Sequence, residues 1–520
     1  MTTAIDAPPP RALESRDPNT GAVWREFEPA SRAEIEAAVA AARKAQAIWG
    51  DVPLRDRAAA LGRVRREIYA RRELLASTLE REIGKPPFEA LFEVIVVADS
   101  AAWAASHAPR ALRPRRFQPR HAAMLRKTVE IRWEPYGVVG VIAPWNYPLL
   151  LAGAPLFASL VAGNAVVLKP SEMTPSCGIE LVETIRAAGL PSGLVQCVLG
   201  GGATGSQLIE SGIDRLFFTG SEATGRKVAA ACGERLIPVS LELGGSDPAI
   251  VLEDADPATA AAGIVWGRFS NAGQTCVATK RVFAVESIHD RLVEELVRAV
   301  AALRIGGGSD RDVSPLIRAS QSELLAAQRR DALGRGARSA VRTEPRVPSA
   351  SAAAAEILVD VNPSMRVMRE ETFGPLLPVV RVRSAEEAVE MANATTYGLS
   401  ASIWTGDRRR GLELARRVHA GTVMVNDVIS EAAMADVPHG GVKASGIGRM
   451  HGLMGLTEAA QSKAIVIDRF SRWPQAWWFP YTDRMMDGLR AFVDFLHGQG
   501  LVSRAVAGVK ATWLLYFGKK

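Results

Sequence analysis

Residues 137–144 have the sequence "GVVGVIAP", a short run of β-branched and apolar residues that stops at a proline. Such a run is typical of a strand that is buried on both faces. Helical stretches such as "CGIELVETIRAAG" and "ATGRKVAAACGERL" separate further runs of the same kind. This alternation predicts an α/β fold with a parallel, doubly wound sheet, which binds ligands at the carboxyl ends of its strands. The further runs are "NAVVLKP" (164–170), "LVQCVLG" (194–200), "RLFFTG" (215–220) and "PAIVLED" (248–254).

The chain extends well beyond this region on both sides. Its 520 residues are too many for one hydrophobic core, so we expect two or more domains. Upstream, Ser31 and Glu34 have capping-box spacing before an alanine-rich helix, and a second helical region covers about 55–83. Downstream, a second α/β region starts near Gly244 and includes "RVFAVES", "RLVEELVRAVAAL", "ASIWTG" and "GTVMVN". Residues 305–355 are rich in loops and low in complexity.

Composition excludes several classes of protein. The 63 basic and 56 acidic residues are interspersed, so the net charge of +7 indicates a solvated surface, and we expect no nucleic-acid partner. The four cysteines form no CxxC pair, which argues against disulfides and against a metal site and favours a reducing, cytoplasmic location. Residues 1–15 contain no apolar core of a secretory signal and are expected to be a disordered lead-in.

The last fifty residues differ from the rest. Residues 471–520 hold four of the eleven tryptophans together with several cations, and charged residues interrupt every apolar run before it could span a bilayer. We expect helices here. Aromatic and cationic residues on amphipathic helices suit peripheral contact with a membrane surface, and they equally suit packing on a neighbouring subunit.

Three residues could form a site for attack on a carbonyl group. Cys276 lies in "NAGQTCVA", where polar residues and glycine replace the apolar neighbours of an ordinary buried cysteine. Glu242 ends the strand-like "PVSLELGG", and Asn146 lies between two prolines in "PWNYP". Each has a structural alternative: an inert thiol, a turn acceptor and a turn residue. Together they supply a nucleophile, a base for water, and an amide donor for an oxyanion.

A hydride acceptor would turn this attack into an oxidation, and two segments suggest its site. In "FFTGSEATGRKV", Gly220 and Gly225 bracket a strand-to-helix turn that Ser221 can cap, leaving helix N–H groups for a phosphate. The spacing does not match the GxGxxG fingerprint. In "LKPSEMTP", Lys169 and Glu172 could reach sugar hydroxyls, and a carboxylate there favours NAD over NADP. The alternative for this pair is an exposed ion pair.

With these motifs, the chain resembles the aldehyde dehydrogenase superfamily over about residues 16–468. Many ordered motifs make the resemblance specific, whereas any one alone would be weak. They are "PWNYP" (144–148), "AGNAVVLKPSE" (162–172), "FTGSEATG" (218–225), "LELGG" (241–245), "GQTCVA" (273–278), "EETFGP" (370–375), "YGLSASIWT" (397–405), "GTVMVN" (421–426) and "PHGGVKASGIGR" (438–449).

The resemblance implies a role for each site residue. It makes Cys276 the nucleophile, Glu242 the base that activates the deacylating water, and Asn146 the oxyanion donor. It implies oxidation of an aldehyde to the carboxylate with NAD, or with NADP, through a thiohemiacetal and a thioester. The residues it assigns to cofactor binding are Trp145, Lys169, Ser171, Glu172, Thr219, Gly220, Ser221, Gly225, Leu243, Glu371 and Phe373.

The resemblance also implies a domain plan. A Rossmann-like NAD-binding domain would comprise 16–113 and 134–243, and an α/β catalytic domain 244–440. Small oligomerisation elements, a hairpin at 114–133 and a late strand within 441–470, would build a homodimer or homotetramer. Residues 471–520 would be a C-terminal extension.

Two alternatives to hydrolytic oxidation stay open. In a CoA-acylating semialdehyde dehydrogenase, CoA takes the acyl group, but related enzymes of that type generally lack the carboxylate that Glu242 provides. A non-catalytic scaffold of the same fold, held to membrane or partner by its tail, would be expected to have lost the catalytic residues.

Overall fold

The computed structural model describes residues 12–120, 124, 126–306, 310–347, 351–470, 475 and 477–517. The chain separates into two compact units, which are described separately. The first unit comprises Met1–Arg113 and Trp133–Ser462, and the second comprises Pro114–Arg132 and Lys463–Lys520.

The first unit begins with a two-stranded antiparallel sheet, β1 (Leu13–Arg16) and β2 (Val23–Phe27). The expectation of a disordered lead-in over 1–15 is therefore wrong for residues 13–15, while residues 1–11 lie outside the described residues. The physical reason is a long-range contact. The buried Ser15 hydroxyl donates a hydrogen bond of 2.6 Å to Glu82, a residue 67 positions away in the chain.

Four helices follow. The capping box at Ser31 and Glu34 is confirmed, because the Ser31 hydroxyl accepts from the Glu34 N–H while the Glu34 carboxylate accepts from the Ser31 N–H. The single helical region expected over 55–83 is two helices that meet at Arg71. These helices are α1 (Arg32–Trp49), α2 (Leu54–Ala70), α3 (Arg72–Ile83) and α4 (Pro87–Ala111).

A six-stranded sheet confirms the parallel, doubly wound prediction. Its strand order is β17-β9-β8-β5-β6-β7, with all neighbours parallel except β17, which pairs antiparallel with β9. The chain builds outward from β5 through β6 to β7 and then returns to add β8 and β9 on the other side. The switch point of the topology therefore lies between β5 and β8. The strands are β5 (Val138–Ile142), β6 (Ala165–Lys169), β7 (Val195–Cys197), β8 (Arg215–Thr219), β9 (Val239–Glu242) and β17 (Gly446–Ile447).

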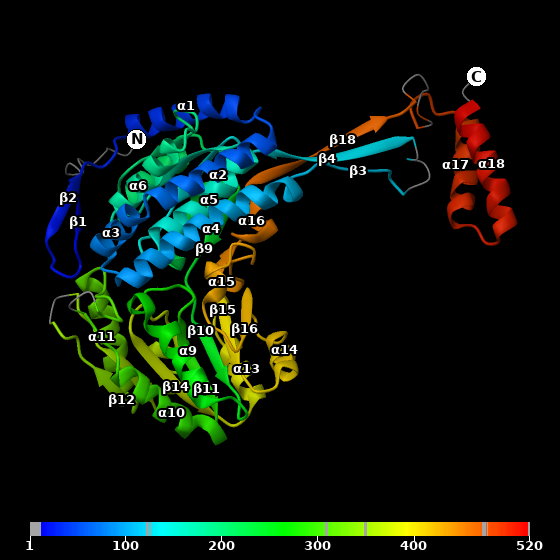
Figure 1. Ribbon diagram of the computed structural model, residues 1–520. Helices are drawn as coiled ribbons and strands as arrows, with labels where there is room; N and C mark the ends of the chain where they lie inside the picture. The colour runs from blue at the N-terminus through cyan, green and yellow to red at the C-terminus, as the bar shows by residue number, and fades with distance from the viewer. Residues whose placement is uncertain are drawn as a thin grey trace, which may run out of the picture. The chain divides into compact units, whose positions relative to one another are not determined.

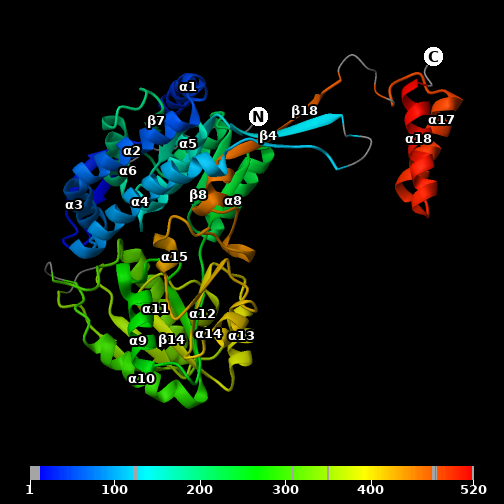
Figure 2. The ribbon, with the colours of Figure 1, turned by 45° about the vertical axis from the view of Figure 1, so that its right-hand side comes forward.

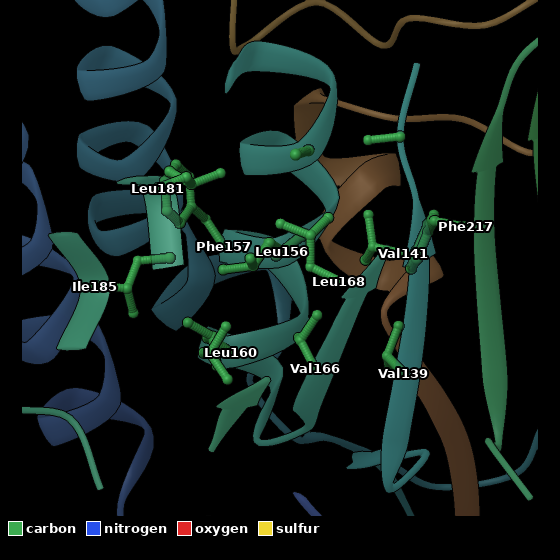
Figure 3. Close-up of a cluster of buried hydrophobic side chains, with 14 of the residues drawn as sticks. Val139, Val141, Leu156, Phe157, Leu160, Val166, Leu168, Leu181, Ile185 and Phe217 are labelled. Atoms are coloured by element: carbon green, nitrogen blue, oxygen red, sulfur yellow. The ribbon is translucent and has the colours of Figure 1, made fainter. Parts of the chain in front are cut away.

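Helices cover this sheet and close its core. Figure 3 shows side chains of α5 and α6 packed with the alternate residues of the central strands, including Val139 and Val141 of β5, Val166 and Leu168 of β6, and Phe217 of β8. Every residue of α5 is buried, which explains its continuous apolar sequence. The helices are α5 (Pro148–Ala162), α6 (Pro175–Ala187), α7 (Gly202–Glu210) and α8 (Glu222–Glu234).

A seven-stranded sheet forms the core of the downstream region. Its order is β12-β13-β14-β11-β10-β15-β16, and only β12 is antiparallel to its neighbour. The "PAIVLED" run lies here rather than with the upstream strands. The strands are β10 (Asp247–Val251), β11 (Thr279–Val285), β12 (Arg338–Thr343), β13 (Ala355–Val359), β14 (Leu376–Val382), β15 (Ser400–Trp404) and β16 (Thr422–Val425).

Helices α9 and α10, which contact each other, lie side by side beside this sheet in both views (Figures 1 and 2). The expectation that 305–355 is loop-rich is wrong over much of its length, because it contains the sixteen-residue helix α11 and strand β12. Tertiary pairing of β12 with β13 overrides the weak local pattern. The helices are α9 (Pro257–Phe269), α10 (Glu286–Ala301), α11 (Ala319–Gly334), α12 (Arg366–Arg369), α13 (Ala385–Asn393), α14 (Arg408–Ala415), α15 (Ser430–Ala433) and α16 (Gly452–Glu458).

The second unit contains the whole of one strand and most of two others from the regions where the hairpin and the late strand are expected. β3 (Arg115–Phe117) pairs antiparallel with β4 (Lys127–Pro135), and β18 (Ala460–Asp468) completes a three-stranded sheet. The tail forms two packed helices, α17 (Asp483–His497) and α18 (Leu501–Phe517) (Figure 1). None of the helices in the described part of the chain has both the length and the apolar character needed to cross a membrane.

Candidate active site

The candidate site lies where strands β5 and β9 of the six-stranded sheet end and strand β10 of the seven-stranded sheet begins. Asn146 follows the carboxyl end of β5, and Glu242 is the last residue of β9. The next strand, β10, begins at Asp247, only five residues after Glu242. Gly220 follows β8, and its N–H donates to the Glu242 carbonyl oxygen at 3.0 Å. The site therefore includes the switch point between β5 and β8, where open parallel sheets bind their ligands.

A strained turn presents Cys276. Asn271, Ala272 and Gly273 have φ angles of 49°, 55° and 72°, so three consecutive residues adopt the left-handed conformation that side chains rarely accept. Cys276 is half-buried, whereas Cys177 and Cys232 are buried. The cysteine that the local sequence singled out is therefore on a strained segment and is partly accessible.

Asn146 is bound directly to this turn. Its side-chain amide donates to the Gln274 carbonyl oxygen at 3.0 Å, and the Asn271 amide donates to the Asn146 carbonyl oxygen at 3.1 Å. The Tyr147 hydroxyl lies 3.2 Å from the Thr275 hydroxyl. The structure thus brings together two motifs that are 128 residues apart in the chain.

Glu242 has an unusual environment for a carboxylate. It is 3% exposed, and neither of its carboxylate oxygens has a hydrogen-bond partner among the described residues. A β-carbon added at Gly440 would lie 2.8 Å from one of these oxygens, so the absence of a side chain at Gly440 leaves room for the carboxylate. Burial raises the pKa of Glu242 well above its ordinary value, although Arg449 opposes the shift. A buried carboxyl group of this kind has room in its hydrogen bonding for a water molecule, and its ionised form is a stronger base than an exposed carboxylate.

The charges around Cys276 set the chemistry of its thiol. The pKa of Cys276 is raised to about 12, chiefly by burial and in part by the carboxylates of Asp247, Glu371 and Glu242, while Lys280 opposes the shift. The Lys280 ammonium donates to the carbonyl oxygens of Thr275, at 3.0 Å, and of Cys276. The resting protein therefore holds a protonated thiol next to a buried cation.

The segment "EETFGP" is fixed beside the same turn. The Glu371 carboxylate accepts from the Gly245 N–H at 3.2 Å and lies 3.8 Å from the Lys280 ammonium. The Phe373 ring packs edge-on against Trp145, with centroids 5.6 Å apart. The buried Arg268 guanidinium donates to the Thr372 carbonyl oxygen at 2.9 Å and to that of Gly374.

Several residues expected to bind a cofactor line the carboxyl edge of the upstream sheet. Lys169 ends β6, is 4% exposed, and has its ammonium 3.5 Å from the half-exposed Glu172. Burial lowers the pKa of Lys169. The alternative of an exposed ion pair does not describe this arrangement, because the cation is buried. The buried Ser171 hydroxyl accepts from the Met173 N–H at 3.2 Å.

The start of α8 has the predicted cap. The Ser221 hydroxyl accepts from the Thr224 N–H at 3.3 Å. Gly225, on the first turn, has no room for a side chain, since an added β-carbon would lie 2.4 Å from Leu243. Thr219 pairs with Glu242 across β8 and β9. The residues of this group thus lie on adjoining strands and on the helix that follows them.

We did not predict from the sequence that two side chains of α4 accept hydrogen bonds from the backbone next to the site. The Glu89 carboxylate accepts from the Asn271 N–H at 3.1 Å, and burial raises the pKa of Glu89 to about 7. The Glu93 carboxylate accepts from the Leu149 N–H at 2.9 Å, at the start of α5, and is paired with the fully buried Lys85. The signal was present in "GKPPFEALFEV", where two glutamates four residues apart share a helix face.

Comparison with known proteins agrees with this geometry. Residues 5–465 match the model of the aldehyde dehydrogenase family. The chain is 37% identical over 484 residues to a 4,4'-diapolycopene aldehyde oxidase of Methylomonas sp, an alignment that covers 93% of this chain and 91% of the relative.

Two solved structures are similar over most of their length. One is an NAD-dependent aldehyde dehydrogenase from Sinorhizobium meliloti (TM-score 0.86, 33% identity, 92% of this chain and 95% of that one). The other is an NADP-dependent glyceraldehyde-3-phosphate dehydrogenase from Bacillus halodurans, complexed with NADP (TM-score 0.83, 35% identity, 88% and 96%). The match to the family model spans most of the sequence and the fold agrees, so this chain belongs to the aldehyde dehydrogenase family.

Proposed function

We propose that this protein oxidises an aldehyde to the corresponding carboxylate with a nicotinamide dinucleotide, through a covalent intermediate on Cys276. One observation carries the proposal: the strained turn that precedes Cys276 is hydrogen-bonded to Asn146, which is far from it in the sequence. This arrangement supports a nucleophile and an oxyanion donor held in one site.

In the first step the Cys276 thiolate attacks the aldehyde carbon and forms a C–S bond, and the carbonyl oxygen becomes an oxyanion. The Asn146 amide and the Cys276 N–H donate hydrogen bonds to that oxygen. The Lys280 ammonium, close to the Cys276 backbone, favours the charged form of the sulfur. Loss of hydride from the same carbon converts the thiohemiacetal to a thioester.

In the second step Glu242 takes a proton from a water molecule, whose oxygen attacks the thioester carbon. The C–S bond breaks, the carboxylic acid leaves, and the sulfur returns as a thiolate. Glu242 has no hydrogen-bond partner for its carboxylate oxygens among the described residues, and burial raises its pKa, so its ionised form is a stronger base toward water than an exposed carboxylate; both features support this role.

The nicotinamide dinucleotide supplies the hydride acceptor when it is bound. The residues present fit such a group: the capped start of α8 offers N–H groups to a phosphate, and the buried Lys169 ammonium at the end of β6 can donate to sugar hydroxyls. Glu371 and Phe373 would contact the nicotinamide end. The same proposal assigns Trp145, Ser171, Thr219, Gly225 and Leu243 to the walls of this crevice.

The dinucleotide could carry a 2′-phosphate or lack it. One similar structure is named as NAD-dependent and another as NADP-dependent. Glu172 supports NAD, since its carboxylate would bind ribose hydroxyls and repel a phosphate. Comparing kcat/KM for the two cofactors tests this assignment. The Glu172→Ser variant should shift the ratio toward NADP, and an unchanged ratio would contradict the role of Glu172.

The domain plan belongs to the same proposal. Residues 16–113 and 134–243 would bind the dinucleotide, and 244–440 would carry the nucleophile. Residues 114–133 and 441–470 would join subunits into a homodimer or homotetramer in the cytoplasm.

The experiment is to follow reduced nicotinamide with a panel of short aliphatic, long aliphatic, aromatic and semialdehyde substrates. Cys276→Ala should abolish oxidation while cofactor binding persists, and Cys197→Ala is the matched control, because Cys197 is the other half-buried cysteine. Glu242→Gln should form the acyl-enzyme in a single burst and then stall. Full turnover by Cys276→Ala would overturn the mechanism.

Adding CoA to the same assay separates the alternatives. Hydrolytic turnover predicts full activity without CoA, whereas strict dependence on CoA would identify an acylating enzyme. A complete lack of turnover across the panel would instead favour the scaffold.

A further inference from the structure

The C-terminal hairpin of α17 and α18 has an outer face whose apolar side chains are largely exposed. On α18, five large apolar residues are between 52% and 85% exposed, and the last four of them recur at helical spacing: Leu501, Val502, Val506, Val509 and Trp513. Ala511 and Leu514, on the opposite side of the same helix, are buried. We call the five exposed residues the outer face of α18.

Helix α17, which packs on α18, also carries exposed apolar residues. Met486, Leu489 and Val493 recur at positions i, i+3 and i+7 and are about half exposed, at 45–51%. A charged stripe runs next to them, in which Arg490 and Asp487 form an ion pair of 2.9 Å. Helix α17 is thus amphipathic, with this ion pair on the helix beside its exposed apolar residues.

Aromatic residues lie in the segment that leads into the hairpin. Phe479 is 80% exposed and Tyr481 is 65% exposed, and their rings are 4.6 Å apart. Trp513 of the outer face lies under the Arg484 guanidinium, 4.8 Å from the ring centroid. Tyrosine and tryptophan bearing a polar group or a cation are characteristic of the boundary between lipid acyl chains and water.

The nature of the partner follows from these features together. Eight large apolar side chains of these two packed helices are 45–85% exposed, and large exposed apolar surfaces on soluble proteins mark binding sites. None of the described helices can cross a bilayer, so a lipid partner would be bound from one side. Residues 471–520 contain seven Lys and Arg against three Asp and no Glu, which favours an anionic surface over a neutral one.

We propose that the α17–α18 hairpin binds the surface of an anionic phospholipid bilayer, with the outer face of α18 turned to the acyl chains. Arg484, Arg490, Arg504 and Lys510 would lie at headgroup level. This binding is separate from the chemistry at Cys276 and would hold the enzyme where apolar aldehydes dissolve.

The test is co-sedimentation of the full-length protein with vesicles of phosphatidylcholine alone or mixed in equal parts with phosphatidylglycerol. The wild type should bind the anionic vesicles more tightly, and added salt should weaken that binding. The double variant Val502→Asp, Val509→Asp should lower the partition coefficient by about 100-fold, because two valines lose their burial in lipid. The control is Ser503→Asp, which introduces an aspartate at an exposed residue of the same helix outside the outer face. This variant should keep most of the binding.

Melting temperature, oligomeric state without lipid, and oxidation of a short water-soluble aldehyde complete the design. All three should be the same in the wild type and the double variant. Failure of the wild type to bind either vesicle would overturn the proposal. So would a change of oligomeric state in the double variant, which would identify the outer face as a contact between copies of the chain. Loss of turnover with membrane binding intact would instead count against the proposed function alone.

Discussion

The thiol of Cys276 should behave as a poor nucleophile until a positive charge beyond that of Lys280 comes close to it. With a pKa of about 12, the thiolate fraction at pH 8 is on the order of one in ten thousand, compared with about one in ten for a thiol at the reference value of 9.0. Alkylation by iodoacetamide proceeds through the thiolate. Its rate at Cys276 in the protein without cofactor should therefore rise about tenfold for each pH unit from 7 to 9, without a plateau.

The assay is quantitative mass spectrometry of the peptide that contains Cys276, sampled over time at each pH. Glu371→Gln is the informative perturbation, because it removes one of the carboxylates that raise the thiol pKa and keeps a side-chain oxygen for the Gly245 N–H. The variant should react faster than the wild type at every pH. The oxidised cofactor, whose nicotinamide ring is cationic, should also accelerate the reaction. A plateau below pH 8.5 in the wild type would refute the reasoning, since it would mean that the thiolate is already formed.

Three substitutions away from the reacting atoms test how the site is supported. Lys85→Met should destabilise the fold by about 3–5 kcal/mol in chemical denaturation, because it leaves the buried Glu93 carboxylate without its cation, whereas denaturation at the wild-type midpoint would contradict the pairing. Arg268→Met should lower the free energy of unfolding by about 3 kcal/mol, because the carbonyl oxygens of Thr372 and Gly374 lose their donor. The same loss should raise the KM for the cofactor. An unchanged KM would show that the segment keeps its conformation without Arg268. Ser31→Ala should cost only about 1 kcal/mol and leave kcat/KM unchanged, and a larger effect on activity would show that the α1 cap is coupled to the site.

The agreement between sequence and structure was best for elements with strong local patterns. The β-branched runs at 138–142, 165–169 and 215–219 became adjacent parallel strands, because residues of this shape pack well when both faces of a sheet are covered. The agreement between sequence and structure was poorest where the local sequence pattern is weak. Residues 319–334 form a helix despite their low complexity, and residues 13–15 form a strand through a bond to Glu82.

The sequence by itself determined which groups we propose as reactive and the order in which strands and helices follow one another. A cysteine among polar residues, a glutamate that ends a strand and an asparagine between prolines are local features, and the chain displays them without folding. Only the tertiary structure decided that the Asn146 amide meets the Cys276 turn, that side chains of α4 bond to this turn and to the start of α5, and that Glu242 is buried with no hydrogen-bond partner among the described residues. Contacts between residues more than a hundred positions apart, and the pKa shifts that burial causes, depend on packing of the whole chain, which no local pattern encodes.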